Sequence, residues 1–145
     1  MIDLEARLIT AASLLRDARS GVRPADLPPE LRPSDPTEAY QIQDLVIGQS
    51  GIAGWKVGAT THPGSRTCAA LATATRLADG AALQRGDRRP DLEVEVAVRI
   101  AADLPPRANE YDHATIVAAL GGAHAAFEVV ESRFLDRRHA SALST

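Results

Sequence analysis

The stretch that decides the fold is PDLEVEVAVRI, at residues 90–100. Apolar and polar residues alternate along it, which is typical of a β-strand with one apolar face. Glu93 and Glu95 fall together on the other face, because successive side chains of a strand point to opposite sides. Two neighbouring carboxylates can share one cation, although a solvated strand face explains the same alternation. The apolar face then consists of Leu92, Val94, Val96, Val98 and Ile100.

A second stretch with strand character, residues 123–134, contains a further carboxylate, Glu128. Alternation places Glu128 on the same face as Ala126 and Val130. A helix over residues 112–120, ended by the glycine pair 121–122, is expected between the two strands. Three carboxylates from neighbouring strands suit a hard divalent cation, and oxygen ligands favour Mg²⁺ or Mn²⁺ over Zn²⁺.

The N-terminal third is expected to be helical. Residues 2–19 repeat apolar side chains every three or four positions, as an amphipathic helix does. A second helix begins at Asp35, an N-cap residue, and Glu38 stands where a capping box requires an acid. That helix is expected to end near Gly48 or Gly51.

A short strand is expected at residues 52–57, with Lys56 between Gly54 and Gly58. Glycine on both sides lets a ligand approach the backbone, which makes Lys56 a candidate site residue, although an exposed strand lysine is the simpler interpretation. Residues 60–79 show only weak periodicity, and no element is assigned there. Helices and strands mix without a βαβ order or a phosphate-binding glycine loop, so the fold class is α+β.

Composition limits the function further. The formal net charge of −3 and the pI near 5.8 argue against a nucleic-acid partner. A single cysteine fits a reducing compartment. The sequence shows no basic start followed by an apolar run, and no stretch apolar enough for a membrane span, so a cytoplasmic protein is expected.

Four short motifs occur in order within residues 35–134, and together they carry a resemblance. The motifs are AYQIQ at 39–43, GWKVG at 54–58, EVE at 93–95 and FEVVESR at 127–133. With these motifs, the chain resembles the fumarylacetoacetate hydrolase superfamily, and within it the branch of 2-keto-4-pentenoate hydratase and 4-oxalocrotonate decarboxylase.

The resemblance implies a fold, an activity and a site. The fold would be an N-terminal helical region, residues 1–34 with a Pro-rich connector, followed by part of a mixed β-sheet roll at 35–134 and a tail at 135–145. The activity would be that of a hydro-lyase on 2-keto acids of the 2-hydroxypenta-2,4-dienoate type, from aromatic catabolism. Glu93, Glu95 and Glu128 would bind Mg²⁺ or Mn²⁺, and Lys56 would face the substrate.

Two alternatives stay open at this point. A 4-oxalocrotonate decarboxylase-like activity would use the same metal and the same class of substrate. A truncated, non-catalytic remnant or assembly subunit would retain the fold without turnover, since family members continue beyond the last motif and Thr67 stands where they carry an acid. Strands such as residues 92–100 need partners on their edges, so a homo-oligomer is expected.

Overall fold

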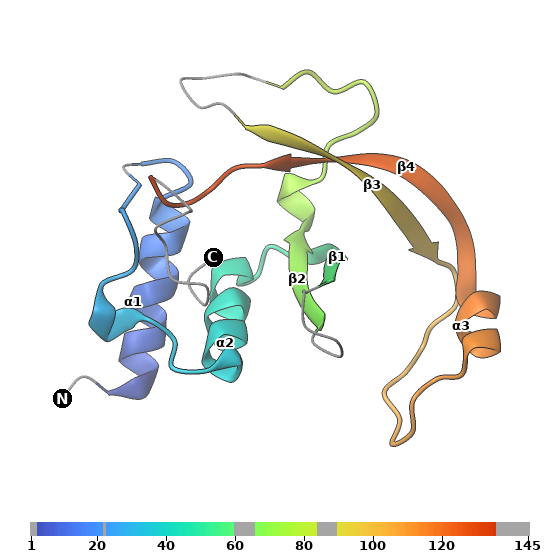
Figure 1. Cartoon of the computed structure of the whole chain (residues 1–145), viewed down its shortest axis with the longest axis horizontal. Coiled ribbons are helices and arrows are strands. Elements are labelled where there is room, and N and C mark those ends of the chain that lie inside the picture. Colours follow the sequence, from blue (N-terminus) through green and yellow to red (C-terminus); the bar gives the residue numbers. More distant parts are fainter. Residues whose placement is uncertain (1–2, 22, 60–65, 84–89, 136–145) are drawn as a thin grey trace. The chain divides into compact units, whose positions relative to one another are not determined.

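The computed structural model of the chain describes residues 3–21, 23–59, 66–83 and 90–135 (Figure 1). Helices and antiparallel sheets occur together in these residues, which confirms the α+β class. The chain divides into two compact units. The helical unit comprises Met1–Gln84 and Ser132–Thr145, and the ribbon unit comprises Arg85–Glu131. The division expected from the sequence, with boundaries after residues 34 and 134, stays a prediction.

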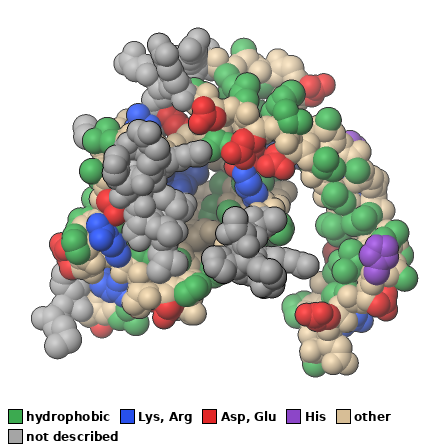
Figure 2. All heavy atoms as spheres, viewed as in Figure 1, with side chains coloured by type: hydrophobic (Ala, Val, Ile, Leu, Met, Phe, Trp, Pro, Cys, Tyr) green, Lys and Arg blue, Asp and Glu red, His purple; other side chains and the backbone are tan. Residues whose placement is uncertain are grey.

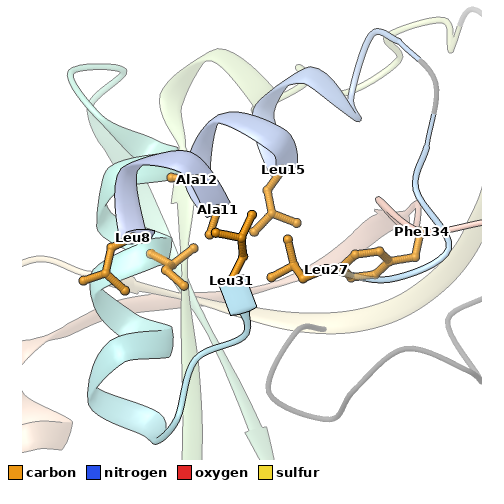
Figure 3. Close-up of a cluster of buried hydrophobic side chains, with 8 residues drawn as sticks. Leu8, Ala11, Ala12, Leu15, Leu27, Leu31 and Phe134 are labelled. Atoms are coloured by element: carbon orange, nitrogen blue, oxygen red, sulfur yellow. The ribbon is translucent and has the colours of Figure 1, made fainter. Parts of the chain in front are cut away.

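The helical unit contains both helices expected from the sequence. Helix α1 spans Leu4–Asp17, helix α2 spans Pro36–Ile47, and a short 3-10 helix, η1, spans Pro29–Leu31 between them. Side chains three and four positions apart on α1 are buried, as an amphipathic helix requires. The core cluster (Figure 3) consists of Leu8, Ala11, Ala12, Leu15, Leu27, Leu31, Ile42 and Phe134.

Phe134 joins this core from far along the sequence. It is 2% exposed and lies next to Leu27 (Figure 3). Two hydrogen bonds hold its neighbours in place: Leu135 N donates to Pro24 O at 2.9 Å, and Arg23 Nη1 donates to Ser132 O at 3.3 Å. The helical unit is therefore built from two separate parts of the chain.

Helix α2 begins as expected, with one difference in its capping. The Asp35 carboxylate accepts a hydrogen bond from Glu38 N at 2.9 Å, which confirms the N-cap. The Glu38 carboxylate accepts from Ser34 N at 2.8 Å, one residue earlier than a capping box predicts. It also pairs with Arg7 of α1, at 2.6 Å, so Glu38 connects the two helices. The hydrogen bond from Arg7 is the main reason why the pKa of Glu38 is lowered.

Strand β1, Ile52–Ala59, confirms the expected strand and pairs antiparallel with β2, Arg66–Ala72, which the sequence did not predict. Helix α2 hydrogen-bonds to the backbone of β2. The Gln43 side chain accepts from Ala70 N at 3.0 Å, and the Tyr40 hydroxyl accepts from Cys68 N at 3.3 Å. These side-chain hydrogen bonds pair backbone N–H groups of β2, as the backbone of a further strand would. Another short 3-10 helix, η2, follows β2 at Thr73–Thr75.

The ribbon unit is a curved pair of antiparallel strands (Figure 1). Strand β3 spans Asp91–Ile100 and strand β4 spans Leu120–Val130. Helix α3, His113–Ala119, precedes β4. Its N-cap is Asp112, whose carboxylate accepts a hydrogen bond from Thr115 N at 2.7 Å. Both expected strands are confirmed, although the second begins earlier and ends earlier than the sequence suggested.

The glycine pair was predicted to end the helix, and that prediction is wrong. Gly121 and Gly122 lie inside β4, where the register shifts beside Arg99. Arg99 Nη2 donates to Gly121 O at 2.7 Å, and a Cβ on Gly121 would stand only 2.6 Å from that nitrogen. Gly122 has a φ of 143°, which L side chains rarely adopt. The glycines therefore allow an irregular strand start rather than a helix stop.

The contact between Arg7 and Glu38 predicts a pH-dependent contribution to stability. A carboxyl group whose pKa is lowered on folding stabilises the fold above its unfolded-state pKa, and the contribution is lost as the pH falls through the folded-state pKa. Glu38→Gln should therefore melt at a lower temperature than the parent at pH 7. The two proteins should converge in acid, once Glu38 is protonated in both states.

Thermal melts followed by circular dichroism across this pH range measure the effect. Glu30→Gln is the control, since Glu30 is an exposed carboxylate of the same unit. A difference between parent and Glu38→Gln that persists unchanged into acid would contradict the assignment.

Candidate metal centre

Three carboxylates meet on one face of the ribbon. The register places Glu93 directly opposite Glu128, and Glu95 opposite Ala126, two residues from Glu128 on the same face. One carboxylate oxygen from each of the three residues lies within 4.8 Å of the other two. In the part of the chain that the structure describes, this is the one group of three or more Asp, Glu, His or Cys side chains so arranged. We call it the carboxylate triad.

The spacing of the triad suits a small hard cation. In an octahedral Mg²⁺ site with metal–oxygen distances of about 2.1 Å, neighbouring and opposite oxygens lie about 3 and 4 Å apart. Oxygens within 4.8 Å therefore need only modest side-chain rotation to reach that geometry. All three ligands are carboxylate oxygens, which favours Mg²⁺ or Mn²⁺ over softer metals. The geometry is thus compatible with the expected metal, whose presence stays a prediction.

Charge gives a physical reason for a cation at this place. Two carboxylates 4.8 Å apart repel each other by about 1 kcal/mol in water, and by about 3 kcal/mol at an effective dielectric constant near 20. Glu93 and Glu128 are partly buried, so water screens their charges less than on an open surface. A divalent cation between the three groups would offset the repulsion among all of them.

Other polar side chains share this face of the ribbon. The strand period puts Asp91 on it, and the register adds His124 opposite Ala97. Arg99 also belongs to the face, but it stands four residues from Glu95, about 13 Å along the strand. Alternation alone could have placed both residues on this face, since Asp91 precedes Glu93 by two positions and His124 precedes Ala126 by two.

Lys56, the other predicted site residue, lies on β1 of the helical unit. It is partly buried and stands opposite Ala69 of β2. A Cβ on the neighbouring Gly58 would be 3.2 Å from the hydroxyl of Thr67, so glycine allows close strand packing there. The triad belongs to the ribbon unit, and the role of Lys56 beside a metal-bound substrate stays a prediction.

Comparison of the chain with protein-family models, with curated proteins and with solved structures found no match. The resemblance to the fumarylacetoacetate hydrolase superfamily therefore depends on the four motifs alone. Among the described residues, no helix combines the length and the apolar character that crossing a bilayer demands.

The triad predicts a metal-dependent gain in stability. A cation that binds only the folded chain stabilises it by about 2.7 kcal/mol at one hundred times its dissociation constant. Mg²⁺ or Mn²⁺ should therefore raise the melting temperature, and Ca²⁺ should do so less because it prefers more ligands at longer distances. Differential scanning fluorimetry of the parent chain with each cation measures the shift.

Two Glu→Gln variants test whether the triad is responsible. Glu95→Gln should lose most of the shift while the metal-free protein remains at least as stable, because one repelling charge is gone. Glu110→Gln is the matched control, since Glu110 is exposed, belongs to the same unit and lies outside the triad. Equal shifts in both variants would show that the triad does not bind the cation.

Proposed function

We propose that this chain is a divalent-metal-dependent, hydratase-like lyase that acts on 2-keto acids of the 2-hydroxypenta-2,4-dienoate type. The observation that carries the proposal is the convergence of Glu93, Glu95 and Glu128, each with an oxygen within 4.8 Å of the others. The convergence of these three carboxylates supports the binding of a divalent metal, and the four motifs support the class of substrate. The proposal needs both, because a carboxylate cluster by itself does not select a reaction.

The carboxylates would hold the cation and leave room for a substrate. Three protein ligands occupy about half of a six-coordinate shell, and the remaining positions are open to water or to the oxygens of a ligand. A bound divalent cation supplies Lewis-acid stabilisation of negative charge that develops on a carbonyl oxygen. Hydration of a conjugated 2-keto acid and loss of a carboxylate from such an acid both depend on that stabilisation.

Lys56 has two possible tasks in this proposal. As a cation, its ammonium group would hold the substrate carboxylate by charge. With a lowered pKa, the same group would transfer a proton during hydration. Both tasks require the Nζ atom to face the bound substrate, which can be tested directly.

Turnover is the first test of the proposed function. Conversion of 2-hydroxypenta-2,4-dienoate should depend on Mg²⁺ or Mn²⁺ and be lost in Glu95→Gln but not in Glu110→Gln. We expect the rate to fall below the usual 1–10³ s⁻¹, since loss of a general acid or base costs about 10²–10⁴-fold and Thr67 stands at the position expected for an acid. The loss of dienol absorbance measures this rate.

A parallel assay with 4-oxalocrotonate separates the candidate functions. Release of CO₂ from 4-oxalocrotonate would identify a decarboxylase instead of a hydratase. Metal-induced stabilisation without conversion of either compound would assign the chain a non-catalytic role and contradict the proposed activity.

Lys56 can be tested separately, because it is the only lysine of the sequence. An amine-acylating reagent followed by peptide mapping reports on Lys56 apart from the N-terminus. Mn²⁺ together with an unreactive saturated 2-keto acid should slow this acylation, whereas Mn²⁺ alone should not. The protection should disappear in Glu95→Gln. An acylation rate that the ligand pair leaves unchanged would show that Lys56 does not face the substrate.

A further inference from the structure

The second face of the β3–β4 ribbon is apolar and exposed. Side chains on this face alternate with the carboxylates, and the register aligns Val94 with Phe127 across the strands. Val94 is 79% exposed and Phe127 is 73% exposed. Hydrophobic side chains follow the curve of the ribbon in Figure 2. The large members of this apolar face are Leu92, Val94, Val96, Val98, Phe127 and Val129.

We propose that the apolar face of the β3–β4 ribbon binds the same face of a second copy of this chain. The exposed area of its six large residues amounts to roughly 700 Å², close to the 800 Å² or so that each partner contributes to an interface of standard size. Two copies packed face to face would bury at most about twice that area, an upper limit that exceeds the lower bound of about 1,000 Å² for a specific interface.

The composition of the face favours a second copy over a charged partner. The eight positions that the regular part of the register assigns to it, before the shift between Arg99 and Ile100, all carry apolar side chains: they alternate from Leu92 to Val98 on β3 and from Ala123 to Val129 on β4. The face therefore has no charge that would select a partner of opposite sign. A two-fold axis needs only a patch that complements itself, which a uniformly apolar face satisfies.

The sizes of the side chains also fit such an axis. On β4, the large Phe127 follows two small residues, Ala123 and Ala125, on the same face. When two β4 strands run antiparallel across a two-fold axis, Phe127 of each copy meets the alanines of the other. Sheets that pack face to face stand about 10 Å apart and interdigitate large and small side chains in this way.

Sedimentation equilibrium of the full chain across the micromolar range tests the proposal. We expect a reversible equilibrium between the 15.4 kDa chain and a species of twice that mass. Val94→Lys should raise the dissociation constant at least tenfold, since a charge would be buried at the centre of the interface. Val117→Lys is the matched control, because Val117 is 49% exposed on α3 of the same unit and should leave the constant unchanged.

A cross-linking experiment identifies the face without relying on a destabilising charge. In a Cys68→Ser background, Ala125→Cys should give a covalent dimer with a short bis-maleimide cross-linker, which spans facing sheets about 10 Å apart where a direct disulfide would not, and Val117→Cys should not. A monomer at all concentrations, or open-ended association without a dimer plateau, would overturn the proposal. So would a dimer that Val94→Lys leaves intact and that Ala125→Cys fails to cross-link.

Discussion

The antiparallel register of β3 and β4 is the constraint on which both candidate surfaces depend. It places Glu128 opposite Glu93 and Phe127 opposite Val94, so charge collects on one face and apolar area on the other. A slip by one residue would turn Glu128 toward the valines and Phe127 toward the carboxylates, because strand side chains alternate. At one end of the strand pair the pairing is irregular beside Arg99, whose side chain donates a hydrogen bond to Gly121 O. The regular register runs from there to the other end of the pair.

The two faces of the ribbon are complementary in their physical requirements. A pair of strands is by itself at best marginally stable in water. The three carboxylates repel one another, which a cation would offset, and exposure of the apolar face to water is unfavourable, which a second ribbon would relieve. A metal and a second copy would thus stabilise the same pair of strands from opposite sides, and through unrelated forces.

The sequence predicted those parts of the structure that depend on local pattern. The alternation in residues 90–100 identified β3 and grouped Glu93 with Glu95, and Asp35 identified the start of α2. Strand β2 was missed because RTCAALA contains mostly small side chains, and its pairing depends on β1 and on Gln43 of a distant helix. Periodicity also cannot show whether a face is covered, so the exposure of Val94 became evident only in the structure.

The position of Phe134 in the core of the helical unit has a consequence for biosynthesis. Its ring packs with α1 and η1 residues that are translated more than one hundred positions earlier. While the ribosome is still making β3 and β4, the first 84 residues lack this part of their core and the hydrogen bonds at Pro24 and Ser132. The ribbon sequence is therefore complete before the core of the helical unit can form, although α1 of that unit is the first element to be synthesised. Until Phe134 emerges, Leu27 lacks the ring that it packs against in the folded unit.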